Sequence, residues 1–165
     1  MDTITYIKAS EQFAESYCSA VDTVAKERKY LASVDGFPLD STIGFVKMIE
    51  ANNLAQFYAI ENDQVIGWCD ILPKSFEGLR HVGVLGMGVL GNYRGQGIGR
   101  TLLEMTLDHA KNINGLEKVE LEVFESNLPA IKLYAHLGFK IEGVREKSRK
   151  LDGRYDNIVL MGKYL

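Results

Sequence analysis

Apolar residues recur at intervals of three and four in several stretches of the chain, a spacing that places them on one face of an α-helix. The first predicted helix starts at Ser10, whose hydroxyl can cap its first turn, and runs to about Tyr30. Three further helices are expected: directly after Ser41-Thr42, over 98–113 and over 127–138. Of these, the segment 98–113 has the broadest apolar face.

Other stretches alternate apolar and polar residues or form short apolar runs, which is typical of β-strands. Seven strands are expected, over 3–7, 57–60, 65–71, 81–90, 119–123, 139–150 and 155–165. The turn residues Asn62-Asp63-Gln64 and Asp152-Gly153 each join two strands into a predicted hairpin. Because runs of antiparallel strands interrupt the alternation of strands and helices, the order predicts an α+β fold.

Composition narrows the class of protein. The chain has 165 residues, 46% of them hydrophobic and 25% charged, and no linker-like segment divides it, so a single globular domain over 1–165 is expected. A net charge of -3 argues against a nucleic-acid partner, and no apolar run reaches the ~20 residues that cross a membrane. The N-terminus also lacks a signal-peptide pattern, so a soluble, cytoplasmic protein is expected. Cys18 and Cys69 do not have CxxC spacing, so neither a metal site nor a disulfide scaffold is expected, and neither cysteine lies in a recognisable nucleophile context.

The densest chemical signal is Tyr93-Arg94-Gly95-Gln96-Gly97-Ile98-Gly99-Arg100, between a predicted strand and a predicted helix. Glycines let the backbone approach a ligand closely, and the first amides of the helix have no intrahelical acceptor. These amides, with Arg94 or Arg100, can bind a pyrophosphate. The alternative is a tight turn that needs glycines for its geometry alone.

Two common phosphate-binding motifs explain this region poorly. A Walker A loop fails because Arg100 follows Gly99 where the motif requires lysine, and Arg94 stands five positions before Gly99 where it requires glycine. The segment Gly86-Met87-Gly88-Val89-Leu90-Gly91 matches the dinucleotide fingerprint G-x-G-x-x-G. However, Gly95 and Gly97 interrupt the helix that this fingerprint should open, which makes a dinucleotide-binding protein an unlikely alternative.

A third motif fits better. Arg94-Gly95-Gln96-Gly97-Ile98-Gly99 resembles the R/Q-x-x-G-x-G/A motif of the GCN5-related N-acetyltransferases, the GNAT family. The segment from Asn127 to Tyr134, closing in Leu137-Gly138-Phe139, is similar to a second signature of that family. The element order also matches, so the resemblance covers nearly the whole chain. It implies a mostly antiparallel mixed sheet of about seven strands, splayed at a cofactor cleft, with about four helices.

The resemblance also implies acetyl-CoA as cosubstrate. Residues Gly95 to Arg100 would bind its pyrophosphate, and Gly88, Val89 and Leu90 would pair with its pantetheine arm. The full set of cofactor-binding residues expected from the resemblance is Gly88, Val89, Leu90, Arg94, Gly95, Gln96, Gly97, Ile98, Gly99, Arg100, Asn127 and Tyr134. Gly86 and Gly88 are consistent with a β-bulge, or they merely relieve crowding. Asn127 is equally suited to capping a helix.

The implied reaction is direct transfer of an acetyl group to a primary amine in a ternary complex, which makes the chain an acyltransferase for groups other than aminoacyl groups. Tyr134 matches the tyrosine that donates a proton to the departing CoA sulfur, although a core tyrosine is the alternative. The acceptor amine must lose a proton, and His81 occupies the place where some family members carry a glutamate. Asp70, Glu120 and Glu122 are other candidate bases, directly or through water.

The acceptor is not identified by the sequence. In this family it is usually selected by segments that correspond here to 27–42, 75–80 and 147–156. Aromatic residues in the first of these, among them Tyr30 and Phe37, can line an acceptor pocket or close the core. The acceptor can be a small molecule or a protein amino group, and a homodimer is expected by resemblance. An acyl-CoA-binding sensor without turnover is the alternative function.

Overall fold

The computed structural model describes residues 3–165, which form seven strands and four α-helices. The elements are β1 (Thr5–Lys8), α1 (Ala14–Lys26), α2 (Leu39–Ala51), β2 (Ala55–Glu61), β3 (Gln64–Pro73), β4 (Val82–Val89), α3 (Ile98–Asn112), β5 (Lys118–Phe124), α4 (Leu128–His136), β6 (Lys140–Leu151) and β7 (Arg154–Tyr164). The strands form one mixed sheet in the order β1-β2-β3-β4-β5-β7-β6. The predicted α+β class and the numbers of strands and helices are confirmed.

Internal contacts divide the chain into two compact units. The first unit holds the described residues up to Leu72 together with Leu85–Gly115. The second unit holds Pro73–Val84 and Leu116–Leu165. β4 contributes to both, because its residues up to Val84 belong to the second unit and the later ones to the first.

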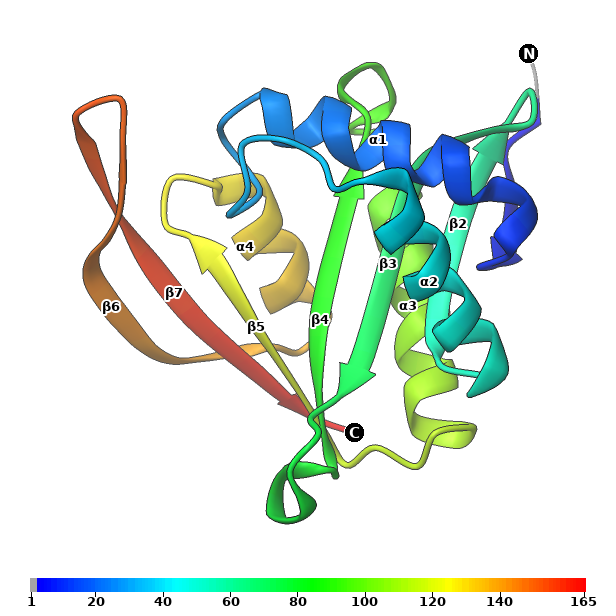
Figure 1. The fold of residues 1–165 in the computed structure, drawn as a ribbon. Helices are drawn as coiled ribbons and strands as arrows, with labels where there is room; N and C mark the ends of the chain where they lie inside the picture. Colours follow the sequence, from blue (N-terminus) through cyan, green and yellow to red (C-terminus); the bar gives the residue numbers. More distant parts are fainter. Residues whose placement is uncertain (1–2) are drawn as a thin grey trace. The chain divides into compact units, whose positions relative to one another are not determined.

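In the first unit, helices cover both faces of β2 and β3 (Figure 1). On one face, Tyr17 of α1 stacks on Tyr58 and meets Trp68 edge-on, with ring centroids 5.1 and 5.9 Å apart. On the other face, Thr106 of α3 donates a hydrogen bond to the Cys69 carbonyl. Trp68 and Cys69 point to opposite faces because they are neighbours on one strand.

Two helix boundaries in this unit differ from the sequence-based prediction. Ser10 caps a short 3-10 turn before α1, and α1 ends at Lys26 instead of near Tyr30. Arg28 has φ of +59°, which cannot continue an α-helix. The second helix starts at Leu39, before the expected Ser41-Thr42, because Pro38 occupies its N-cap position.

In the second unit, β5 pairs in parallel with β4 over Val82–Val84 and antiparallel with β7 along its whole length. The β6–β7 hairpin turns at Asp152-Gly153, where both residues have positive φ, as predicted. The short helix α4 ends at His136, and Gly138, whose φ is +92°, follows its C-cap residue Leu137. Among the helices formed by residues 3–165, none combines the length and apolar character needed to cross a bilayer.

Candidate active site

The loop before α3 has the geometry of an anion-binding site. Gly95 and Gly97 have φ of +75° and +82°, and a Cβ added at either position would contact nothing within 4 Å. The backbone conformation, and not crowding, is therefore what requires glycine. The first helical hydrogen bond runs from the Thr101 amide to the Gly97 carbonyl at 3.1 Å. The amides of Ile98, Gly99 and Arg100 precede it at the positive end of the helix dipole, in an exposed turn that fits a pyrophosphate.

The Arg94 side chain, expected to contribute to this site, has partners within the chain. Its guanidinium donates two hydrogen bonds to the Glu27 carboxylate, at 2.8 and 2.6 Å, and one to the Val89 carbonyl at 2.9 Å. It also lies over the ring of Tyr30, 4.4 Å from the ring centroid. The hydrogen bonds from Arg94 lower the pKa of Glu27. Arg94 thus ties the end of α1 to the end of β4 and positions the loop.

The glycines of β4 admit side chains from β3. A Cβ on Gly88 would lie 2.4 Å from the Trp68 indole, so Gly88 is required for the close packing of Trp68. At Gly86, an added Cβ would lie 3.4 Å from the Asp70 carboxylate. Of the two interpretations raised for these glycines, relief of crowding is therefore correct for Gly88, while a bulge stays a prediction.

Asp70 is the one acidic residue in the apolar segment from Val65 to Ile71, and its surroundings are unusual. The side-chain amide of Gln56 donates to its carboxylate at 3.4 Å, and Gln56 in turn accepts from the Tyr58 hydroxyl at 3.4 Å. Burial raises the pKa of Asp70 to about 7, while the hydrogen bond from Gln56 acts in the opposite direction. A carboxyl group with this pKa is available both as an acid and as a base near neutral pH.

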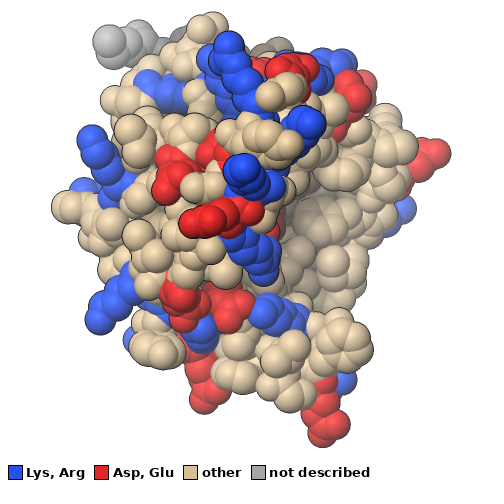
Figure 2. All heavy atoms as spheres, turned by 90° about the vertical axis from the view of Figure 1, so that its left-hand side faces the viewer, with Lys and Arg blue, Asp and Glu red and all other residues tan. Residues whose placement is uncertain are grey.

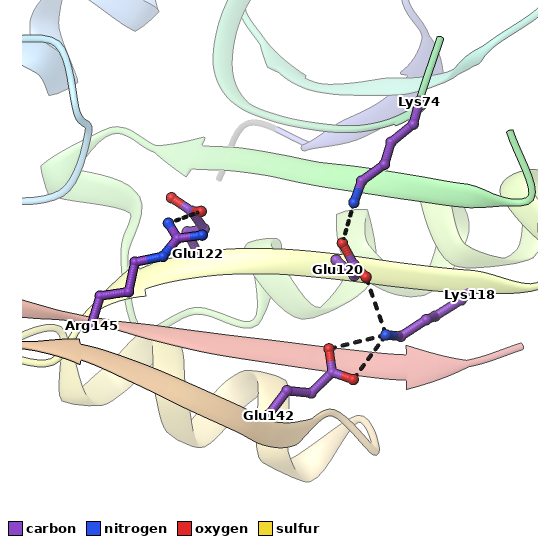
Figure 3. Close-up of polar contacts among 6 residues, drawn as sticks. All are labelled: Lys74, Lys118, Glu120, Glu122, Glu142 and Arg145. Carbon is purple, nitrogen blue, oxygen red and sulfur yellow. Dashed lines mark hydrogen bonds and ion pairs between the residues drawn. The ribbon is translucent and has the colours of Figure 1, made fainter. Parts of the chain in front are cut away.

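Glu120 and Glu122, two other candidate bases, are engaged in ion pairs on β5 (Figure 3). Glu120 accepts from Lys74 at 2.5 Å and from Lys118 at 3.1 Å. The hydrogen bond from Lys74, the largest cause, lowers its pKa. Glu122 accepts from Arg145 at 2.6 Å. The lysines stabilise the ionised form of Glu120 and make it a weaker proton acceptor than Asp70.

Three predicted site residues, His81, Asn127 and Tyr134, lie in the second unit. His81 is exposed just before β4, and its backbone carbonyl accepts from the amides of Glu117 and Lys118. Asn127 caps α4 by accepting from the Ala130 amide at 3.3 Å, which is the structural role suggested as its alternative. Tyr134 is 7% exposed and meets Phe139 edge-on, with ring centroids 5.8 Å apart.

The α1–α2 connection forms part of a pocket in the first unit, which we call the apolar pocket. It has a volume of about 640 Å³ and is lined by Tyr17, Val21, Leu31, Ala32, Ser33, Phe37, Ser41, Thr42, Phe45, Trp68, Gly86 and Met87. Of the two aromatic residues for which both roles were left open, Phe37 lines this pocket, whereas Tyr30 lies against Arg94. Sequence reasoning did not identify Trp68 or Met87 as part of such a site, although a tryptophan next to a glycine-rich strand was a possible signal.

A comparison with protein-family models identifies the chain's relatives: the model described as the acetyltransferase (GNAT) family matches residues 21–139. The chain belongs to the GNAT family. An N-alpha-acetyltransferase of Saccharolobus solfataricus is 37% identical over 106 residues, which cover 58% of this chain and 62% of that protein. The match therefore spans less than two thirds of that relative's length.

Solved GNAT structures share the fold. An acetyltransferase of the family from Streptococcus pneumoniae has a TM-score of 0.92 and 24% identity, covering 99% of this chain and 100% of its own. The protein yncA of Salmonella typhimurium, solved with its cofactor acetyl-CoA, has a TM-score of 0.90 and 19% identity, covering 98% and 94%. These likenesses show that the chain has the fold of the GNAT family.

Charge on one face of this GNAT chain is mixed in sign. Basic and acidic side chains are interleaved over the face drawn in Figure 2, with no separate patch of one sign. Within residues 3–165, no three His, Cys, Asp or Glu side chains gather where they could hold a metal ion. The Cys69 thiol is buried, and burial raises its pKa, which does not suit a nucleophile.

Proposed function

We propose that this protein is an acetyl-CoA-dependent N-acetyltransferase that acts on a primary amine by direct transfer, with Asp70 as the general base. Acetyl-CoA, when bound, supplies the acetyl group as an activated thioester. The amides of Gly97 to Arg100 are proposed to hold the pyrophosphate, and the backbone of Gly88 to Leu90 is proposed to pair with the pantetheine arm. Transfer forms a C–N bond and breaks the C–S bond, so the nitrogen loses a proton and the sulfur gains one.

The observation that carries this proposal is the placement of Asp70 beside Gly86 on β4, the strand that leads into the amide loop. An alkylamine with a pKa of about 10.4 is protonated at neutral pH, so acetyl transfer needs a group that removes its proton. Asp70 has a raised pKa and accepts a hydrogen bond from a neutral amide, whereas Glu120 and Glu122 have cationic partners. Asp70 is therefore favoured over them as the acceptor of the amine proton.

Tyr134 is proposed to donate the proton to the CoA sulfur. A phenol with an ordinary pKa near ~10 retains its proton at neutral pH and can donate it to a thiolate. The edge-on contact with Phe139 fixes the ring of Tyr134. Replacing Tyr134 with Phe keeps this ring contact and removes the proton donor, so a fall in kcat is expected.

The decisive experiment mixes the purified protein with acetyl-CoA and a panel of primary amines and measures release of the free CoA thiol. Amine-dependent release supports the enzyme, and binding of CoA by calorimetry without release from any amine favours the sensor. The variants Asp70→Asn and His81→Ala then separate the two candidate bases: we expect a large loss in the first and little change in the second. A loss confined to His81→Ala would contradict the assignment of Asp70. The cytoplasmic location and the homodimer expected from the sequence stay predictions.

A further inference from the structure

We propose that the acceptor carries a large, uncharged apolar group, which binds in the apolar pocket and presents its primary amine at the Gly86 end of that pocket. The inference deepens the proposed N-acetyltransferase function and rests on it. It names a class of acceptor, which is an amine with an aromatic or branched aliphatic substituent and no second charge.

The size and lining of the pocket suit such a group. Its volume of about 640 Å³ lies within the range of small-molecule sites, and aromatic rings from α1, α2 and β3 surround it. None of the residues that line it is charged. Phe37 is 60% exposed although it belongs to this apolar lining, so a large apolar area is accessible to solvent at the pocket. Covering it with a ligand would be favourable.

The wall that carries Phe37 is held in place by α1. The Gly36 amide donates to the Asp22 carboxylate at 2.9 Å, and the Cys18 thiol donates to the Phe37 carbonyl at 3.3 Å. A Cβ on Gly36 would lie 2.6 Å from the Cβ of Asp22, so the connection packs directly on the helix. The pocket is therefore at least partly formed before a ligand binds, which lowers the entropic cost of binding.

The Gly86 end of the pocket lies near a carboxylate. Gly86 belongs to the lining, and it is also the residue where an added Cβ would approach the Asp70 carboxylate to 3.4 Å. The polar groups near the Asp70 carboxylate include the phenols of Tyr17 and Tyr58, whose pKa values it helps to raise, and the neutral amide of Gln56. An amine at Gly86 would meet a single proton acceptor there, while its substituent lies among the apolar side chains.

The same features disfavour polyamines and small polar amines. A second ammonium group in the pocket would lose its hydration without meeting a carboxylate among the lining residues, and an unpaired buried charge is costly. A short polar amine would leave the apolar side chains uncovered. The expected preference therefore comes from both the apolar contact and the absence of a second anionic partner in the pocket lining.

The test compares kcat/KM for acetyl transfer among phenethylamine, 3-methylbutylamine, spermidine and ethanolamine, with a peptide whose first residue is phenylalanine as a further arm. We expect both apolar amines to exceed spermidine and ethanolamine by at least about tenfold. The peptide shows whether the acceptor is a small free amine or the N-terminus of a polypeptide, because both present a primary amine beside an aromatic group. Equal or faster transfer to spermidine or ethanolamine would overturn the inference while leaving the N-acetyltransferase function intact.

A second measurement does not depend on turnover. Trp68 is the only tryptophan in the sequence and lines the pocket, so its fluorescence reports occupancy. Titration with 3-methylbutylamine should change the Trp68 emission, and Phe37→Ser should weaken this binding about tenfold through lost apolar contact. Tyr164→Ser is the matched control, because Tyr164 is an 83% exposed aromatic residue outside the pocket.

The two measurements separate the possible failures. If no amine releases CoA thiol but 3-methylbutylamine still binds at Trp68, the transferase function fails and the apolar site stands. An unchanged emission on titration overturns the site. Faster transfer from hexanoyl-CoA than from acetyl-CoA to ethanolamine would mean that the pocket takes an acyl chain, which also overturns the inference.

Discussion

Asp70 on β3 and Glu120 on β5 are both carboxylates on strands of the sheet, but their surroundings differ in kind. Asp70 lies among apolar and neutral polar groups, and burial raises its pKa to about 7. Glu120 lies between Lys74 and Lys118, and hydrogen bonds from these lysines lower its pKa. The first group therefore exchanges a proton near neutral pH, whereas the second remains ionised.

The difference arises from what replaces water around each carboxylate. Two ammonium groups compensate Glu120, so ionisation costs little even though the group is partly buried. Asp70 has lost hydrating water, and the long hydrogen bond from Gln56 does little to stabilise its ionised form. A carboxylate accepts a proton readily near neutral pH only if few nearby groups stabilise its ionised form. Asp70 meets this condition, and Glu120 does not.

The largest expected effect concerns the rate of acetyl transfer. Asp70→Asn should lower kcat/KM by about 10²–10⁴-fold, the usual contribution of a general base, while acetyl-CoA binding is unchanged. In the wild type, kcat/KM should rise with pH and level off above an apparent pKa of about 7, because the ionised carboxylate is the active form. This rise of kcat/KM with pH should be absent in Asp70→Asn. A pH profile that is the same in both proteins would contradict the assignment.

A second variant changes the surroundings of Asp70 without touching it. Gly88→Ala places a methyl group 2.4 Å from the Trp68 ring, which must move, and the free energy of unfolding should fall by about 1–3 kcal/mol. Because Trp68 and Asp70 lie on the same face of β3, this movement should admit water and lower the apparent pKa in the rate profile. Denaturant titration measures the stability.

The matched control for Gly88→Ala is Gly44→Ala. Gly44 lies inside α2, and an added Cβ meets nothing within 4 Å. This change should raise the free energy of unfolding by about 0.5–1 kcal/mol, because alanine loses less conformational entropy in a helix. A similar loss of stability in both variants would rule out the contact with Trp68 as the cause.

The third effect is on stability as a function of pH. The folded pKa of Asp70, about 7, is higher than its usual value near ~4, so the folded state keeps a proton that the unfolded chain releases. The wild type should therefore lose stability as pH rises from about 4 to about 7. Asp70→Asn removes this loss and should be more stable than the wild type by about 1–3 kcal/mol at pH 8, with the difference vanishing near pH 3. Thermal unfolding at a series of pH values measures the difference, and a less stable variant at pH 8 would be evidence against a desolvated carboxylate.

The smallest effect on stability is expected for Glu120, the ion-paired carboxylate of β5. Glu120→Gln removes ion pairs with Lys74 and Lys118, whose side chains are partly exposed, and should cost at most about 1 kcal/mol. The sign with pH is opposite to that of Asp70, because the lowered pKa of Glu120 contributes stability that is lost on acidification. The rate of acetyl transfer should not change, and a large fall in kcat would move the role of base to β5.

Most of the fold was predictable because its signals are local. The alternation in β5, the turn at Asp152-Gly153 and the apolar face of α3 each depend on a few neighbouring residues. The amide loop was equally accessible, since positive φ at Gly95 and Gly97 follows from local sequence. The early end of α1 was not predicted, because the polar residues after Lys26 are compatible with either a helix or a loop.

The sequence did not predict which side chains would become partners in the folded chain. Glu27 and Arg94 are 67 positions apart, and nothing in the sequence pairs them. The acid in the apolar segment of β3 was visible from the sequence, but a lone acid can face solvent, a lysine or an apolar pocket. Its pKa depends on which of these the folded chain places beside it.

Local order along the chain was enough to establish the strands, the helices, the glycine loop before α3 and membership in the GNAT family, because period, turn chemistry and motif spacing are properties of adjacent residues. Three-dimensional packing was needed to distinguish Asp70 from Glu120, to give Arg94 its partner and to form the apolar pocket. Desolvation and ion pairing depend on groups that are distant in sequence and meet only after folding.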